Sequence, residues 1–274
     1  MSRKTEDGAI GIFDSGIGGL TVMREIMRIL PQENLIYLGD TARVPYGIRS
    51  RETVQRYAVE NATFLLSQNI KLIVVACNTV SAVGIDAIRE ITDVPVIGVL
   101  KPGARAAVKN TVKKRVGVIG TEATIQSSAY QKEIKSLKND IDVLTKACPL
   151  FVPLVEEGWL EGDIVEAIIS TYLSELKESG IDTLVLGCTH YPLLKKSIQR
   201  VMGNEVRLID SAVETARAVR ELLHEKGLIS SSDKQGYRAF YVTDSPDRFR
   251  NIGERFLGCQ IQEIKKIQIP YRIN

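Results

Sequence analysis

The sequence predicts an α/β fold in which two similar parallel-sheet α/β domains, related by an internal repeat, face each other. Apolar runs of strand type alternate with helical patterns along most of the chain, which is typical of parallel α/β architecture. The order of parts also repeats. A strand that enters a polar turn at Asp14 is followed 63 residues later by Cys77, and a strand that enters Thr121 is followed 67 residues later by Cys188.

In the first half of the chain, short apolar runs alternate with segments of helical periodicity. The longest expected helix has an apolar stripe along one face, and Ser50 is placed to cap its start. We expect strands at residues 9–13, 34–38, 71–76 and 95–99, and helices at residues 20–30, 50–68 and 81–91.

The pattern restarts at Arg115. Asp163, with Glu166 three residues later, has the form of a capping box, Ser211 is placed to open another helix, and Gly203 suits a helix end. We expect a strand at 116–120, helices at 163–178, 190–202 and 211–227, and a return of residues 237–243 and 261–269 to the first domain. The predicted domains are residues 1–98 with 209–274, and residues 99–208.

The composition is that of a globular protein and argues against several classes of function. Hydrophobic residues make up 44% of the chain, and the net charge of +3 comes from interspersed residues of both signs, so no nucleic-acid partner is expected. No apolar run approaches the roughly 20 residues of a membrane helix. Residues 1–8 lack the apolar core of a signal peptide. We therefore expect a cytoplasmic protein without a membrane partner.

Two of the four cysteines stand out by their position. Cys77 and Cys188 each end an apolar run and precede hydrogen-bonding residues, at the strand ends where parallel sheets place their ligands. A helix starting directly after each cysteine would lower the thiol pKa. A single cysteine of this kind could equally be a buried structural residue, but the repeat favours a function for both. Two matched thiols suit a reaction that moves a proton from one face of a carbon centre to the other.

The other two cysteines, Cys148 and Cys259, have no matched partner and are expected to be structural. The four positions contain no CxxC pair, so neither a metal site nor thiol–disulfide chemistry is expected.

Residues 14–19 form a glycine-rich turn from a strand to a helix. The turn does not fit GxGxxG, and the chain has no Walker sequence, so no nucleotide cofactor is expected. Its backbone N–H groups could hold a carboxylate. Asp14 is either a helix cap or a functional residue beside Cys77.

Other polar residues lie near the expected strand ends. The loop of residues 39–47 is polar and stiff, and could be a lid or a connection. His190 follows the second cysteine closely, whereas His224 is expected on a solvated helix face. Short donors that could hold carboxylate and amino groups, or merely cap helices, are Asn78, Thr79, Thr121, Thr124 and Thr189.

Together these segments resemble the glutamate racemases, cofactor-independent enzymes that make D-glutamate for bacterial peptidoglycan. The resemblance covers residues 9 to about 215 in the family's order, and the tail beyond about 230 carries no motif. The matching segments are residues 14–19, 39–43, 45–47, 76–79, 120–121, 153–158 and 187–192.

The resemblance implies that Cys77 takes the α-proton from D-glutamate and that Cys188 takes it from L-glutamate, each returning a proton on the opposite face. Asp14 would support Cys77, while His190 with Glu156 would support Cys188. The active site would lie in the cleft between the two domains. The implied substrate-binding residues are Asp14, Ser15, Tyr46, Gly47, Asn78, Thr79, Thr121, Thr124, Thr189 and His190.

The resemblance further implies that the enzyme uses no cofactor and no metal, and acts on glutamate as a homodimer. Aspartate racemase is the main alternative, but there the second cysteine is usually followed by Thr-Glu, whereas here Thr189 and His190 follow it. A two-lobed amino-acid-binding protein is a non-catalytic alternative, and it would have no use for matched cysteines. Racemisation of glutamate is therefore the predicted function.

Overall fold

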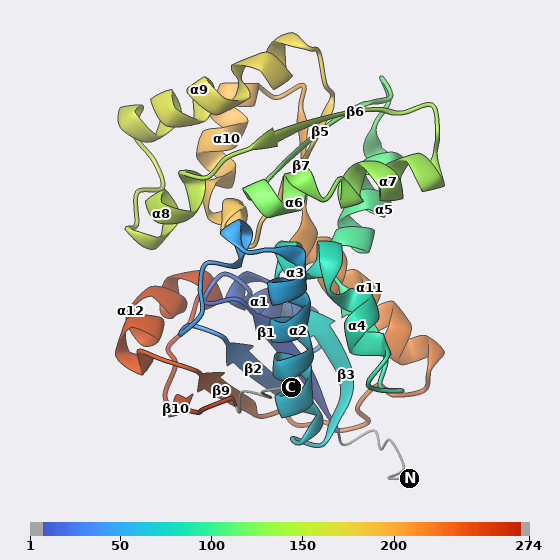
Figure 1. The fold of residues 1–274 in the computed structure, drawn as a ribbon, viewed down its shortest axis with the longest axis vertical. Helices are drawn as coiled ribbons and strands as arrows, with labels where there is room; N and C mark the ends of the chain where they lie inside the picture. Colours follow the sequence, from blue (N-terminus) through green and yellow to red (C-terminus); the bar gives the residue numbers. More distant parts are fainter. Residues whose placement is uncertain (1–7, 270–274) are drawn as a thin grey trace.

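The computed structural model describes residues 8–269 and contains two β-sheets, in each of which all strands run parallel. Helices flank both sheets, and the two resulting α/β lobes are stacked along the long axis of the molecule (Figure 1). We call the lobe at the bottom of this view the first lobe and the lobe at the top the second lobe. The prediction of two parallel-sheet α/β domains is confirmed.

The sheet of the first lobe has the strand order β10-β9-β2-β1-β3-β4. Its central strands are apolar runs buried along their whole length, as expected for a parallel sheet covered on both faces. The last two strands come from the end of the described chain and extend this sheet beside β2. The strands are β1 (Ala9–Asp14), β2 (Leu35–Gly39), β3 (Ile70–Val75), β4 (Val96–Gly98), β9 (Arg238–Val242) and β10 (Lys265–Lys266).

The sheet of the second lobe has the strand order β6-β5-β7-β8. Its strands are β5 (Arg115–Gly120), β6 (Asp142–Ala147), β7 (Thr183–Gly187) and β8 (Arg207–Asp210). The domain boundaries proposed from the sequence stay a prediction, and the one after residue 208 would cut β8.

The two sheets repeat one arrangement, which confirms the internal repeat. β1 lies between β2 and β3 in the first lobe, just as β5 lies between β6 and β7 in the second. Cys77 follows β3 closely and Cys188 follows β7 directly, so the two cysteines occupy equivalent places.

Helices connect the strands and cover the sheets. Two short 3-10 helices, η1 (Tyr46–Ile48) and η2 (Tyr191–Leu194), lie close to the motifs singled out above. The α-helices are α1 (Leu20–Ile29), α2 (Arg51–Leu66), α3 (Asn78–Val83), α4 (Ile85–Arg89), α5 (Leu100–Asn110), α6 (Glu122–Gln126), α7 (Ala129–Leu137), α8 (Phe151–Glu156), α9 (Asp163–Glu178), α10 (Lys195–Met202), α11 (Ser211–Glu225) and α12 (Pro246–Leu257).

Helix starts follow the sequence prediction only in part. The Ser50 hydroxyl accepts a hydrogen bond from the Thr53 amide and caps α2, as predicted. The capping box at Asp163 is wrong: Asp163 is the first residue of α9, and Gly162 precedes it without a side-chain cap. The helix expected at residues 211–227 does begin at Ser211, but its cap is the side chain of Asp210, which accepts a hydrogen bond from the Ala212 amide.

Two expected helices are also divided. The helix expected at residues 81–91 begins earlier, directly after Cys77, and breaks at Gly84 into α3 and α4. The helix expected at residues 190–202 starts as the 3-10 turn η2 and continues as α10, which ends at Gly203 as predicted.

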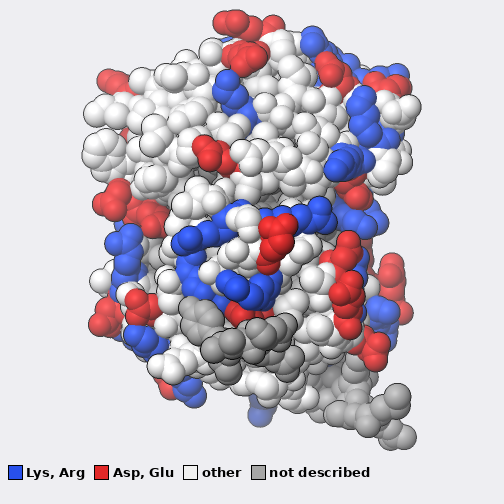
Figure 2. All heavy atoms as spheres, viewed as in Figure 1, with Lys and Arg blue, Asp and Glu red and all other residues white. Residues whose placement is uncertain are grey.

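The lobes are joined through α11, which packs against both α1 and α5. One hydrophobic core therefore contains buried residues of both sheets, such as Ile12 and Leu186. On the face drawn in Figure 2, acidic and basic side chains are mixed over both lobes, and Lys and Arg side chains gather where the lobes meet. None of the helices between residues 8 and 269 has the length and apolar character needed to cross a membrane.

Candidate active site

Cys77 and Cys188 meet at one cavity between the two lobes. Each cysteine is 6% exposed, and both line a cavity of about 270 Å³. Because each sheet contributes one cysteine, the thiols approach the cavity from different lobes.

Most residues of the predicted site line the same cavity, at the carboxyl ends of the parallel strands. Asp14 and Thr124 lie behind this lining and are 1% exposed. From the predicted set, the lining consists of Ser15, Tyr46, Gly47, Cys77, Asn78, Thr79, Thr121, Glu156, Cys188, Thr189 and His190.

Cys77 lies in an environment that favours the neutral thiol. Burial raises its pKa to about 12, and the negative charge of Asp14 acts in the same direction. A hydrogen bond from the backbone of Val80 lowers the pKa, but six-residue α3 does not offset the loss of water. The helix start therefore acts in the expected direction, but the expected net lowering of this thiol's pKa is wrong because burial outweighs it. The Ser15 hydroxyl lies 3.8 Å from Cys77 Sγ, within hydrogen-bond distance for sulfur.

Asp14 is not a helix cap, since Gly19 precedes α1. Its Oδ2 accepts a hydrogen bond of 3.0 Å from the Gly16 amide, while its buried Oδ1 has no hydrogen-bond partner within residues 8–269. Burial raises the pKa of Asp14, although the nearby charge of His190 partly offsets this. Asp14 thus holds the turn and carries one free oxygen behind the cavity.

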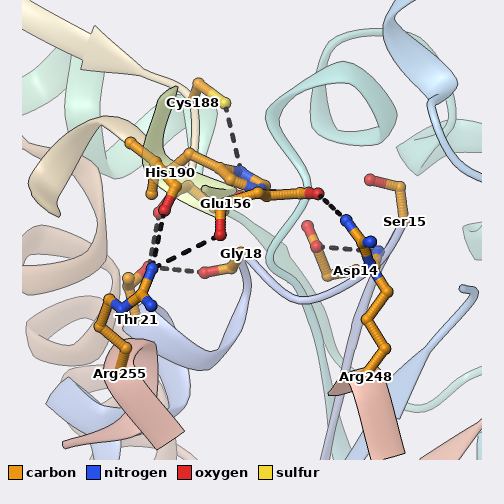
Figure 3. A network of polar contacts seen from close by, with 12 residues as sticks. Asp14, Ser15, Gly18, Thr21, Glu156, Cys188, His190, Arg248 and Arg255 are labelled. Atoms are coloured by element: carbon orange, nitrogen blue, oxygen red, sulfur yellow. Dashed lines mark hydrogen bonds and ion pairs between the residues drawn. The ribbon is translucent and has the colours of Figure 1, made fainter. Parts of the chain in front are cut away.

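A chain of polar contacts leads away from Cys188 (Figure 3). His190 Nδ1 lies 3.9 Å from Cys188 Sγ, and His190 Nε2 lies 3.2 Å from Glu156 Oε1. Burial alone would lower the pKa of His190, but the hydrogen bonds to Cys188 and Glu156 outweigh it and raise the pKa to about 10. The imidazole is therefore a cation at neutral pH. The α-helix expected directly after Cys188 is absent: a 3-10 helix, η2, begins at Tyr191, and α10 follows from Lys195.

Helix α12, which the sequence analysis did not predict, supports this chain from the first lobe. Arg248 lies 3.3 Å from the second oxygen of Glu156. Arg255 donates to the Val155 carbonyl at 3.2 Å, and the ring of Phe256 meets the His190 ring edge-on with centroids 5.1 Å apart. The apolar spacing of Phe249, Ile252, Phe256 and Leu257 was the available signal for this helix.

The start of α1 also contacts the second lobe. The Thr21 hydroxyl donates to the carbonyls of Gly18 and Thr189, at 2.9 and 3.0 Å. A Cβ atom at Gly18 would lie 2.5 Å from His190 Nδ1, so only glycine lets the turn approach the imidazole this closely.

A cluster of threonine hydroxyls joins the lobes on another side of the cavity. Thr79 of α3 lies 3.1 Å from Thr121 and 3.3 Å from Thr124, measured between hydroxyl oxygens. Thr121 and Thr124 lie 3.0 Å apart, and Thr121 caps α6. Thr121 thus caps a helix and lines the cavity at the same time. Thr79 also lines the cavity, and Thr124 lies behind the lining.

The loop before α2 is held by a buried polar network. The Tyr46 hydroxyl donates to Asp40 and accepts from Asn61 at 3.0 Å. Arg43 forms ion pairs with Asp40, at 2.7 Å, and with Glu60. At Gly47, a Cβ atom would lie 2.9 Å from Thr121 Cβ of the second lobe, so this loop also needs glycine to close on its partner. The loop is thus a fixed wall of the cavity in this structure.

The sequence analysis missed the apolar side of the cavity. Val44, Pro45 and Ile48 line it from the loop before α2, while Pro149, Val152 and Pro153 line it from the segment after β6. Gly16, Ile17 and Glu122 complete the lining. Isolated apolar residues in loops and short helices give no local signal of a binding role, although Pro45 and Pro153 lie in matched segments.

The arrangement suits acid/base chemistry on a small molecule. One thiol keeps its proton, while the other lies beside a cationic imidazole that can stabilise a thiolate. Such a pair can remove a proton and deliver one within the same cavity. Among residues 8–269, no group of three or more His, Cys, Asp or Glu side chains could hold a metal ion.

The chain is similar to known proteins over nearly its whole length. Residues 10–219 match the family model Asp/Glu/Hydantoin racemase. A glutamate racemase of Geobacter metallireducens is 54% identical over 261 residues, which cover 95% of this chain and 97% of that relative.

Solved structures of glutamate racemases are similar to this chain as well. A glutamate racemase of Francisella tularensis in complex with D-glutamate has a TM-score of 0.90 at 42% identity, with 96% of this chain and 98% of that chain covered. A glutamate racemase of Bacillus anthracis has a TM-score of 0.93 at 43% identity, with 97% and 99% covered. The resemblance found in the sequence is confirmed: the chain belongs to the Asp/Glu/Hydantoin racemase family and is an enzyme of the racemase type, an isomerase.

Proposed function

We propose that the protein interconverts L- and D-glutamate without a cofactor, with Cys77 and Cys188 as the two proton-transferring groups. The observation that carries this proposal is that two thiols, from equivalent places in the two lobes, line one cavity. The names of the relatives support glutamate as the substrate, and one of the similar structures holds D-glutamate.

In the proposed mechanism, Cys188 takes the α-proton of L-glutamate and Cys77 delivers a proton to the opposite face. The resting charges suit this direction, because Cys77 keeps its proton and the His190 cation can stabilise a thiolate at Cys188. The reverse reaction starts from a Cys77 thiolate and a Cys188 thiol. Asp14 supports Cys77, while His190 and Glu156 support Cys188.

The α-proton of an amino acid is a very weak acid, so the site must stabilise the charge that develops beside the carboxylate. Oriented donors in a water-poor cavity can do so. The proposed donors to the substrate are the hydroxyls of Ser15, Thr79, Thr121 and Thr189, the amide of Asn78 and the backbone of Gly47. Thr124 acts behind them by holding Thr79, while Tyr46 lines the cavity and holds its loop through Asp40.

We further propose that the enzyme acts in the cytoplasm as a homodimer and supplies D-glutamate for peptidoglycan synthesis. A cellular test is depletion of the enzyme, which should make growth depend on added D-glutamate. Normal growth without D-glutamate after depletion would contradict this role.

The direct test is circular dichroism of L-glutamate or D-glutamate incubated with purified, reduced protein and no added cofactor. Either enantiomer should lose its signal, and in D₂O the α-hydrogen of the product should be replaced by deuterium. Aspartate should react far more slowly. Persistent optical purity with folded protein would sink the proposal, and equal rates on aspartate would point to aspartate racemase.

A further inference from the structure

The side chain of Asn78 carries a buried donor that no other described residue satisfies. Asn78 is 3% exposed, lines the cavity and begins α3 of the first lobe. Its Oδ1 accepts a hydrogen bond of 2.7 Å from the Tyr130 hydroxyl. Its Nδ2 has no hydrogen-bond partner within residues 8–269. A buried donor left without a partner costs about 1–3 kcal/mol, so this amide calls for an acceptor in the cavity.

Tyr130 lies outside the cavity lining, and the hydrogen bond from its hydroxyl to Asn78 connects it to that lining. The residue belongs to α7 of the second lobe and is 2% exposed. Its ring packs beside the residue before Cys188: a Cβ atom at Gly187 would lie 3.2 Å from Tyr130 Cε2. Burial raises the pKa of Tyr130, so its hydroxyl stays protonated and can donate. Packing therefore fixes the Tyr130 ring, and its protonated hydroxyl can donate to Asn78.

An amide side chain presents an oxygen on one side and an NH₂ group on the other. A hydroxyl that donates to the oxygen therefore directs the NH₂ group the opposite way. We propose that Tyr130 is a positioning residue, which holds the Asn78 amide so that Nδ2 donates to a carboxylate of the bound substrate. The inference rests on the proposed function, which supplies a dicarboxylate as the ligand. It also makes this contact depend on both lobes, since Tyr130 and Asn78 come from different ones.

The test is Tyr130→Phe, which removes the hydroxyl and keeps the ring. Without it the amide can turn its oxygen towards the substrate carboxylate. We expect KM for both enantiomers to rise about tenfold, the range of a lost hydrogen bond to a charged group. The two kcat values should stay within about twofold of wild type, because the amide moves no proton and binds both enantiomers. A variant of Cys77 or Cys188 would act on kcat instead.

Tyr191→Phe is the matched control. Tyr191 is buried, as Tyr130 is, but its hydroxyl donates to the backbone carbonyl of Cys148, at 2.9 Å, and not to a side chain that lines the cavity. Both variants should lower Tm by similar amounts, but only Tyr130→Phe should raise KM. A double-mutant cycle separates positioning from a general structural effect. In an Asn78→Ala background, Tyr130→Phe should change KM less than about twofold.

An unchanged KM in Tyr130→Phe overturns the inference, as does an undiminished effect in the Asn78→Ala background. Calorimetric titration with D-glutamate gives the same comparison as a change in Kd, independently of turnover. A wild-type protein that binds D-glutamate without racemising it would refute the proposed function but leave the Tyr130 comparison decisive. A wild-type protein that does not bind glutamate overturns both.

Discussion

The charge on His190 is set by its two neighbours. A free imidazole loses its proton near pH 6.5. Here Glu156 accepts from one ring nitrogen and Cys188 lies beside the other, which keeps the ring cationic in spite of its burial. The thiol on the other side of the cavity has the opposite setting, next to buried Asp14. The two cysteines are therefore alike in place but different in electrostatic surroundings.

The first prediction concerns the four cysteines. Changing Cys77 or Cys188 to Ala should lower racemisation at least a hundredfold, because general acid/base groups contribute roughly 10²–10⁴ in rate. Cys148→Ala and Cys259→Ala are the controls. Cys148 is buried, so its replacement should cost about 1–3 kcal/mol of stability but leave turnover largely intact. Initial rates followed by circular dichroism decide the matter, and an active Cys188→Ala enzyme would refute the two-base scheme.

The second prediction separates the helpers of the two thiols. Asp14→Asn should lower kcat from D-glutamate more than from L-glutamate, and His190→Asn should do the reverse. The ratio of the two kcat/KM values must stay constant, because the equilibrium constant between enantiomers in water is one. The asymmetry therefore appears only in kcat and KM taken separately. Equal losses of kcat in both directions, for both variants, would contradict this division of roles.

At the scale of elements, α12 links the C-terminal part of the first lobe to Glu156 and His190 of the second lobe. Arg248 and Arg255 contact the end of α8 (Figure 3). Phe256 of the same helix packs on His190. The His190 hydrogen bond lowers the pKa of Glu156 most, and the contact with Arg248 adds to this. The helix thus fixes the orientation of a carboxylate that already carries its charge.

The third prediction tests this link with Arg248→Met. Because Arg248 is 59% exposed, its ion pair is worth at most about 1 kcal/mol, and we expect kcat from L-glutamate to fall roughly two- to fivefold. Arg248→Lys should recover most of this loss. Arg217→Met is the matched control, since Arg217 is 57% exposed and pairs with Glu214 on α11. Indistinguishable rates for the Met variants at 248 and 217 would remove α12 from the mechanism.

At the scale of the whole molecule, the two lobes share a core and several polar bridges. The packing of α11 on α1 and α5 joins them, and the threonine cluster joins them at the cavity. Far from the cavity, at the amino end of β3, buried Lys71 pairs with Glu33 at 2.6 Å and donates to the Leu228 carbonyl. The hydrogen bond from Lys71 to Leu228 fixes the segment after α11, and this segment leads back into the first sheet.

The fourth prediction is a pH dependence of stability. The pKa of His190 is raised from 6.5 to about 10, so between these values the folded state holds a proton that the unfolded state has released. The contribution of the His190 proton to the free energy of unfolding is complete below pH 6.5 and is lost as pH rises towards 10. The free energy of unfolding should therefore fall from pH 6.5 to 8.5, and more steeply in wild type than in His190→Asn. Urea denaturation at several pH values measures both slopes, and parallel slopes would contradict the assignment.

The sequence was sufficient for the architecture and for most of the polar residues that line the cavity between the lobes. Apolar strand runs, their alternation with helices and the repeat around Cys77 and Cys188 are local patterns. The geometry of parallel strands then places the ends of those runs together, because all strands in such a sheet finish at one edge. For this reason the sequence alone leads one to expect Asn78 near Cys77, and Thr121 and His190 near Cys188, whereas the meeting of the two edges at one cavity was implied by the family resemblance.

Only the tertiary structure decided the pKa directions and the side-chain contacts, because these depend on neighbours that are distant in the chain. The pKa of Cys77 rises, against the expectation from its helix, because burial removes water that no local pattern records. The contact between Arg248 and Glu156 joins residues 92 apart, and that between Tyr130 and Asn78 joins residues 52 apart. Local periodicity determines which residues form strands and helices, whereas desolvation and the direction of a hydrogen bond are set by whichever groups the completed fold brings into contact.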